Sequence, residues 1–262
     1  MKSTLSRIVL AALCIPLMVG CSETITGPGQ IEAPASPVAQ AMPSPAAVNR
    51  DMVARYAREN WNRTYGTGST QNPFCNYGSQ TSGGNCTNFA SQAIMAGLVG
   101  SSNPQTVYSR RRDFQVDRSA QYVNSYQWYF ESCGIKGPAW AGAHKLWEFA
   151  KYNKATYKSL HFAYVTHDTP TQFMEYSKVM AGDIIFADWE NDGRFDHTMI
   201  VVRYDGAWYS LNRGYNRVRV AYQNQDGFAN QGDMGLGTLN EKYNYKAVFH
   251  VYRPVDYSWT GL

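Results

Sequence analysis

The sequence has little excess charge and few cysteines. Beyond its first twenty residues it has no apolar run long enough to cross a membrane. Its formal net charge is +4, and loss of Lys2 and Arg7 with an N-terminal signal would leave 4 − 2 = +2. A charge so close to neutral argues against a nucleic-acid-binding protein. The one basic run, Arg110 to Arg112, is flanked by Asp113 and Asp117, which predicts a solvated loop or helix face. No period repeats along the chain.

The N-terminal segment has the composition of an export signal. A basic start is followed by the apolar stretch Ile8 to Val19, which is too short to span a bilayer. The stretch ends in Leu-Met-Val-Gly before Cys21 and resembles a bacterial lipobox, in which the peptide is cut before the cysteine and the thiol is acylated. The alternative is ordinary secretion, with Cys21 an incidental thiol.

The domain organisation follows from composition. We predict a lipoprotein signal peptide over residues 1–20 and a tether rich in Pro, Ala and Ser over 21–47, because its prolines prevent regular helix. One folded domain is predicted over residues 48–262. The protein would be exported and lipid-anchored through Cys21 in the bacterial cell envelope, with the membrane leaflet left open.

Helix-like periodicity dominates the first part of the domain and strand-like runs the second. We expect helices over residues 50–61, 86–96, 120–132 and 140–153, and strands over 183–188, 197–204, 207–212 and 246–253. Gly97 should end the second helix. Asn191-Asp192-Gly193 and Asp205-Gly206 are predicted to be hairpin turns. Helices first and an antiparallel sheet second predict an α+β fold.

Three cysteines, Cys75, Cys86 and Cys133, lie within the predicted domain. An exported domain favours disulfides where the geometry permits them. If Cys86 stays free, Cys75–Cys133 is the remaining pair, whereas a Cys75–Cys86 bridge would block the Cys86 thiol. The sequence leaves both pairings open.

Cys86 is the strongest candidate for chemistry, because it follows Gly83-Gly84-Asn85 where a glycine turn runs into a helix. A thiol at a helix N-terminus ionises more easily, and the thiolate is the nucleophile. His197 opens a later apolar strand and can serve as its base. If Asp205-Gly206 is a two-residue turn, Tyr204 pairs with Ala207, and Asn212 lies diagonally from His197, within reach of the imidazole. Cys86, His197 and Asn212 are therefore predicted to form a catalytic triad.

Five blocks together carry a family resemblance: residues 49–51, 83–92, 182–186, 188–197 and 215–217. Their order resembles that of the bacterial "Putative amidase domain" family, which is similar to the NlpC/P60 and CHAP hydrolases and has a papain-like fold. The resemblance spans residues 48–252. It implies a cysteine-dependent amidase or peptidase that forms a thioester intermediate. In the family a histidine often precedes the closing Arg motif, and it aligns loosely with Asn212. Asn85 stands where the family often has aspartate.

The remaining motifs give weaker signals. The oxyanion would be stabilised by the Cys86 N–H and a second donor, for which Gln80, Ser82 and Asn85 are all available. His161 and His167 with Asp168 fit no standard zinc spacing, and the calcium-like run from Asp188 has Met199 where the bidentate acid belongs. We therefore predict no metal and no cofactor.

The sequence predicts an envelope-anchored cysteine amidohydrolase. The expected substrate is a peptidoglycan peptide, which rests on fold analogy and location alone. Two alternatives stay open: a catalytically silent cell-wall-binding module, and an amide or acyl transferase on the same fold.

Overall fold

The computed structural model describes residues 48–63, 71–77, 85–114, 127–152, 160–169, 174–205, 217–223, 231–244 and 246–255. The chain divides into two units, residues 1–41 and 42–262, and every described residue lies in the second. The predicted signal peptide, the tether and Cys21 lie outside the described residues. No helix in the described part of the chain is long and apolar enough to cross a membrane.

The helices of the described residues concentrate in the first half of the domain. They are α1 (Arg50–Asn60), α2 (Asn85–Val99), α3 (Pro104–Ser109), α4 (Pro138–Ala141), α5 (Ala143–Tyr152) and, near the end of the chain, α6 (Leu236–Lys242), with a single 3₁₀ turn at Tyr176–Lys178. Asn49 caps α1, because its side chain accepts the Met52 N–H at 3.0 Å.

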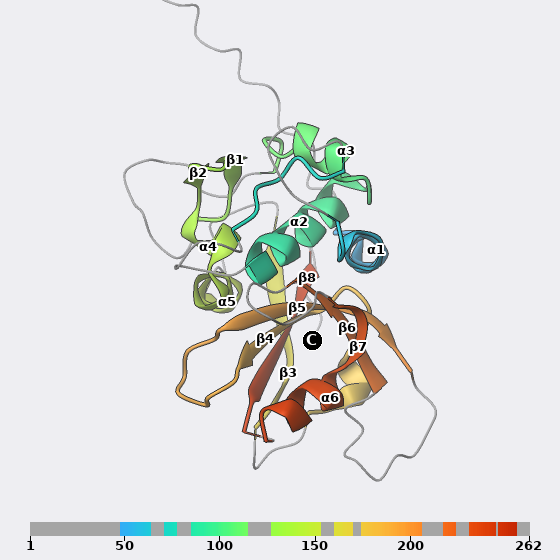
Figure 1. Ribbon diagram of the computed structural model, residues 1–262, viewed down its shortest axis with the longest axis vertical. Coiled ribbons are helices and arrows are strands. Elements are labelled where there is room, and N and C mark those ends of the chain that lie inside the picture. The colour runs from blue at the N-terminus through green and yellow to red at the C-terminus, as the bar shows by residue number, and fades with distance from the viewer. Residues whose placement is uncertain are drawn as a thin grey trace, which may run out of the picture. The chain divides into compact units, whose positions relative to one another are not determined.

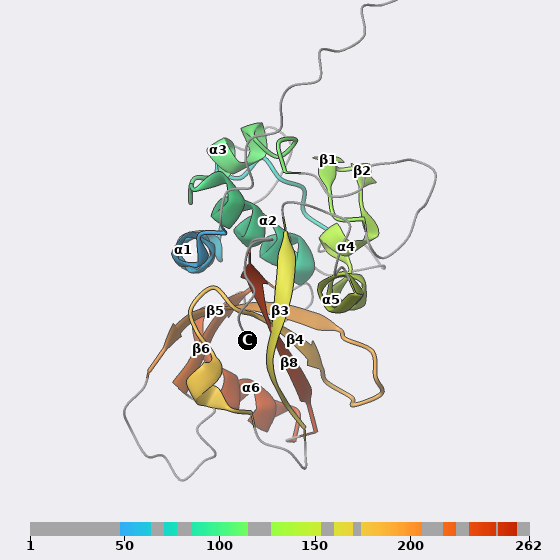
Figure 2. The same ribbon diagram turned by 180° about the vertical axis from the view of Figure 1, so that it is seen from behind.

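The strands form two antiparallel sheets. They are β1 (Phe130–Ser132), β2 (Ile135–Lys136), β3 (His161–Asp168), β4 (Ile184–Asp188), β5 (His197–Tyr204), β6 (Val218–Tyr222), β7 (Gln231–Gly235) and β8 (Val248–Val255). β1 and β2 pair with each other, and the other six strands lie in the order β3-β8-β4-β5-β6-β7. The α+β class is confirmed. Helices α1 to α5 gather on one side of the large sheet and α6 lies on the other (Figures 1 and 2).

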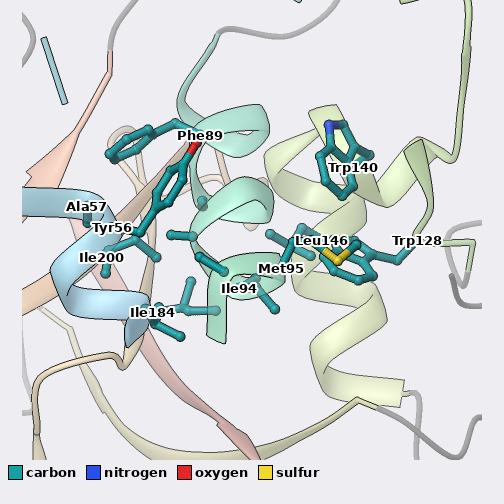
Figure 3. Packing of buried hydrophobic residues seen from close by; sticks show 14 of the residues in the cluster. Tyr56, Ala57, Phe89, Ile94, Met95, Trp128, Trp140, Leu146, Ile184 and Ile200 are labelled. Atoms are coloured by element: carbon teal, nitrogen blue, oxygen red, sulfur yellow. The ribbon is translucent and has the colours of Figure 1, made fainter. Parts of the chain in front are cut away.

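Both faces of the large sheet are buried at its central strands β4 and β5, where alternate residues pack into different layers. Ile184 and Ile200 join the core formed with α1 and α2, whereas Ile185 and Met199 join the core that includes α6. Every residue of α2 is buried. In Figure 3, α2 lies between α1, which contributes Tyr56, and the segment that contributes Trp128, Trp140 and Leu146.

The predicted end of the second helix is wrong. Gly97 lies inside α2, which continues to Val99, and Gly100 follows with φ +75°. A Cβ at Gly97 would lie 2.6 Å from Val53 Cγ2 and 3.0 Å from the Asn49 carbonyl oxygen. Gly97 therefore allows α1 and α2 to approach closely and does not stop the helix.

Two other helix predictions need correction. Residues 127–132, predicted as helix, contain β1, which turns through Cys133-Gly134 into β2; residues 120–126 lie outside the described residues. The helix predicted over 140–153 is present as two helices, because Gly142 interrupts it between α4 and α5.

The strand predictions over 183–188, 197–204 and 246–253 are confirmed within two residues at each end, and the β5 bounds agree fully. The predicted turn between β4 and β5 is also confirmed, since Asn191 and Gly193 have φ of 58° and 86°. The predicted Tyr204–Ala207 pairing is wrong. Tyr204 pairs with Val218, and the Asp205 N–H donates to the Arg217 carbonyl at 2.8 Å. The described strand on the side of β5 away from β4 is thus β6, and the predicted strand 207–212 lies outside the described residues.

Candidate active site

Cys86 is the second residue of α2 and the one free cysteine among the described residues. Its side chain is 3% exposed. The first four N–H groups of a helix have no partner within the helix, and the helix dipole places partial positive charge there. The Cys86 sulfur and its own N–H thus lie where an anion is favoured.

The Cys86 thiol ionises far more readily than its burial alone would allow. Burial raises its pKa, while the charge of His197 and hydrogen bonds from His197, Thr87 and the Thr198 backbone lower it, so that it falls from 9.0 to about 7. At neutral pH a large fraction of Cys86 is therefore thiolate. The structure brings together Cys86 and His197, as the sequence predicted.

His197 is the first residue of β5 and pairs with Ala187 of β4. Its ring is 6% exposed and packs against the rings of Tyr222 and Trp189, with centroids 5.0 and 5.8 Å away. These aromatic contacts limit the orientations that the imidazole can adopt. Its Nε2 is buried and has no hydrogen-bond partner in the part of the chain that the structure describes.

Two threonines join the start of α2 to the start of β5. The hydroxyl oxygens of Thr87 and Thr198 lie 3.1 Å apart, and the Cys86 sulfur lies 3.6 Å from the Thr87 hydroxyl. Both hydroxyls are fully buried. They hold together the two elements that carry the thiol and the imidazole.

A buried amide network surrounds Asn85, the residue before Cys86. Asn85 Nδ2 donates to Gln223 Oε1 at 2.7 Å, and its Oδ1 accepts from Asn88 Nδ2 at 2.9 Å and from the Tyr77 N–H at 3.4 Å. Gln223 follows β6, and its Nε2 donates to the backbone carbonyls of Asn60 and Trp61 at the end of α1. The network thereby connects three segments at the start of α2.

The Cys75–Cys133 disulfide lies beside the same helix terminus. The two Cα atoms are 5.5 Å apart, and Cys86 is not involved. The Cys75 carbonyl accepts from Asn88 Nδ2 at 2.9 Å, and the Tyr77 hydroxyl donates to the Cys133 carbonyl at 3.1 Å. Of the two pairings left open by the sequence, the structure has the one that leaves the nucleophile candidate free.

Several predicted site residues cannot be placed. Asn212, Gln80 and Ser82 lie outside the described residues. The register that placed Asn212 beside His197 is wrong, because β6 begins at Val218. Sequence reasoning also missed Gln223, which in the sequence is only the first residue of a polar run after a strand.

The other candidate ligands have structural roles. The Asp188 carboxylate accepts the N–H groups of Asp192 and Gly193 and holds the turn between β4 and β5. Asp168 Oδ1 accepts the Met174 N–H at 3.2 Å. No group of three or more His, Cys, Asp or Glu residues among the described ones is arranged to hold a metal ion.

Comparison with known proteins identifies the family to which this chain belongs. Residues 47–248 match the family described as "Putative amidase domain", and the chain belongs to it. Membership suggests an amide hydrolase. The match contains the described thiol, imidazole and amide network.

One curated relative also matches. It is the protein of Bacillus subtilis (strain 168) described as "Uncharacterized protein YhbB", which is 28% identical over 121 residues. The aligned region covers 46% of this chain and 30% of YhbB, so the chain spans less than a third of that relative's length. No solved structure matches the chain.

Proposed function

We propose that the protein is a cysteine amidohydrolase in which Cys86 is the nucleophile and His197 the general base and acid. The observation that carries this proposal is the placement of the buried Cys86 thiol, at the start of α2, in hydrogen-bond contact with His197, at the start of β5, which lowers the thiol pKa to about 7. A buried structural cysteine has the opposite shift. A perturbed pKa in a family of amide hydrolases supports a catalytic role.

The proposed reaction has two stages. The Cys86 thiolate attacks the amide carbonyl carbon, and the C–N bond breaks as the His197 imidazolium gives its proton to the leaving amine. A thioester remains. Water then attacks the thioester, His197 accepts its proton, and the acid product leaves with the thiol regenerated.

The negative charge on the carbonyl oxygen requires hydrogen-bond donors. The Cys86 N–H is available because it lies in the first turn of α2. Of the predicted second donors, Asn85 already donates a hydrogen bond from Nδ2 to Gln223 Oε1, and this contact holds the start of α2. Gln80 and Ser82 remain the other proposed donors.

Asn212 remains our proposal for the group that orients His197. The unpartnered His197 Nε2 supports an acceptor at this position. Its assignment to Asn212 rests on the loose alignment with the family. Asn212→Ala should lower kcat and leave Cys86 alkylation measurable; unchanged kcat would exclude Asn212 from the triad.

We further propose a papain-like fold related to NlpC/P60 and CHAP hydrolases, anchorage in the cell envelope through Cys21, and a peptidoglycan peptide as substrate. The papain-like fold is supported by a helix that carries Cys86 next to His197 on an antiparallel sheet. The N-terminal composition supports the second. The third depends on both.

The decisive experiment compares the full chain with Cys86→Ala. Both are incubated with purified peptidoglycan, the products are identified by mass spectrometry, and iodoacetamide labelling is mapped to individual cysteines. We expect Cys86→Ala to lose hydrolysis and the Cys86 adduct. Hydrolysis that persists in Cys86→Ala would exclude Cys86 as the nucleophile.

Two outcomes distinguish the alternative functions. Muropeptide binding without product, with an unreactive Cys86, would favour a binding module. Incorporation of a labelled amine in place of water would favour a transferase, since the thioester then passes its acyl group to the amine.

A further inference from the structure

Gln223 is fully buried between three elements. It lies directly after β6, with its Oε1 2.7 Å from Asn85 Nδ2 and its Nε2 3.2 and 3.0 Å from the carbonyl oxygens of Asn60 and Trp61. All three contacts have normal hydrogen-bond lengths. The side chain therefore links the ends of β6 and α1 to the residue before Cys86.

The orientation of the Gln223 amide is fixed by its partners. Carbonyl oxygens only accept hydrogen bonds, so the NH₂ group must face Asn60 and Trp61. The amide oxygen must then face residue 85, where it requires a donor. Asn85 supplies that donor, whereas an aspartate carboxylate would place acceptor against acceptor.

Asn85 is held equally firmly on its other side. Its Oδ1 accepts from Asn88 Nδ2 and the Tyr77 N–H, so its amide cannot rotate without losing three contacts. Both Gln223 Nε2 contacts go to backbone carbonyls, so this group is engaged in holding α1. Gln223 thus acts through Asn85 and not on a substrate.

We propose that Gln223 is a positioning residue that, through Asn85, holds the first turn of α2 so that the Cys86 sulfur stays within reach of His197. The inference rests on the proposed function, because the position matters only if the thiol reacts. Loss of the Gln223 side-chain amide removes the acceptor of the buried Asn85 Nδ2 and the donor to the Trp61 carbonyl, which favours a shift of the helix start.

The test measures the pH dependence of Cys86 alkylation by iodoacetamide in the full chain, mapped by peptide mass. The variant Gln223→Met keeps the side-chain volume and removes every hydrogen bond. We expect its alkylation midpoint to rise by about one pH unit, with about tenfold slower labelling at pH 6. A wild-type midpoint in folded Gln223→Met would overturn the inference.

Gln92→Met is the matched control. Gln92 is also fully buried, lies on α2 and accepts from the Tyr56 hydroxyl and Asn72 Nδ2, away from Asn85. It should lose stability, as Gln223→Met does, and keep the wild-type midpoint. An equal midpoint shift in Gln92→Met would mean that the shift comes from loss of overall stability and not from the Gln223–Asn85 contact, and it would overturn the inference.

A double-mutant cycle tests the path through Asn85. Asn85→Ala should raise the alkylation midpoint as Gln223→Met does. The double variant should show little further shift, because both substitutions remove the same Gln223–Asn85 hydrogen bond. Fully additive shifts would overturn the inference. If Gln223→Met does not fold, Gln223→Asn, which is one methylene too short to reach both sides, is measured by the same criteria.

The wild-type protein separates the two proposals. A wild-type midpoint near that of an ordinary cysteine, about 8.5, would refute the proposed function and this inference with it. A wild-type midpoint near 7 that Gln223→Met leaves unchanged would refute the inference alone.

Discussion

At the scale of single residues, Cys86 is subject to two opposing effects. Burial favours the neutral thiol, and the charge and hydrogen bond of His197 favour the thiolate. Alkylation requires the thiolate, so its rate rises with pH through the pKa. For a pKa of about 7, about a tenth of the molecules carry a thiolate at pH 6 and about nine tenths at pH 8.

His197→Asn should move this titration to higher pH. The variant removes the charge interaction and the hydrogen bond that lower the Cys86 pKa and leaves the thiol buried, so we expect the alkylation midpoint to rise from about 7 to above 9. His250→Asn is the control, because burial lowers the pKa of His250 to about 4 and leaves it uncharged at neutral pH. A midpoint near 7 in His197→Asn would show that His197 does not activate Cys86.

Residues with a local signature could be predicted, and those defined by distant partners could not. Cys86 follows a glycine pair at a helix start, and His197 begins an apolar strand. The role of Gln223 depends on the carbonyls of Asn60 and Trp61, more than 160 positions earlier in the chain. No local pattern reveals such a contact.

At the scale of elements, α2 depends on its close approach to α1. Gly97→Ala should destabilise the protein by about 1–3 kcal/mol, because the added methyl would lie 2.6 Å from Val53 Cγ2 and 3.0 Å from a backbone oxygen. Urea unfolding measures the change. Gly134→Ala, where nothing lies within 4 Å, should stay within about 0.5 kcal/mol of wild type. Equal stability of both variants would contradict the packing argument.

The pairing of Arg253 on β8 with Asp183, the residue before β4, provides a second element-scale prediction. Asp183 is fully buried and accepts from Arg253 Nε and Nη2 at 2.8 and 2.9 Å. Burial already raises the pKa of Asp183 despite the lowering effect of Arg253. Arg253→Met should therefore cost about 3–5 kcal/mol at pH 7, because it leaves a buried charge unpaired.

The sign of the pH dependence follows from that raised pKa. As pH falls, Asp183 is protonated at a higher pH in the folded Arg253→Met protein than in its unfolded chain. Proton uptake therefore stabilises the folded variant, and its deficit in unfolding free energy relative to wild type should shrink towards pH 4. Arg55→Met, which breaks an exposed pair with Glu59, should change stability by less than about 1 kcal/mol at either pH. A deficit that grows on acidification would contradict this account.

Element positions were predicted well where periodicity and turn chemistry agreed. β5 has the predicted bounds, and the Asn191–Gly193 turn precedes it. The prediction failed at Gly97 because a glycine that stops a helix and one that admits a neighbouring helix look alike in sequence. The predicted strand pairing of β5 was wrong because Asp205-Gly206 looks like a tight turn in the sequence, whereas in the structure the Asp205 N–H bonds to the Arg217 carbonyl, next to the start of β6.

At the scale of the whole molecule, the Cys75–Cys133 bridge links the loop before α2 to the turn between β1 and β2. Cys75→Ala/Cys133→Ala should lower the unfolding free energy by about 2–5 kcal/mol, because it releases a loop whose ends are 58 residues apart. Cys86→Ala, which keeps the bridge, should remain within about 1 kcal/mol of wild type. Comparable losses in the two proteins would mean that the bridge adds no stability.

The α+β class followed from the order of helices and strands, but the order of the sheet did not. β8 lies between β3 and β4, so the last strand of the described chain separates two strands that are much earlier in the sequence. Such a crossover depends on which apolar faces meet after collapse. Hairpin signals specify only neighbours along the chain.

The bridge also bears on how active protein is made. Three thiols of the folded domain compete while the chain oxidises, and Cys75 is much closer in sequence to Cys86 than to Cys133. A premature Cys75–Cys86 link would form readily in the unfolded chain and would block the proposed nucleophile. The yield of protein with a free Cys86 thiol should therefore rise when refolding takes place in a glutathione buffer that lets mispaired bridges reshuffle.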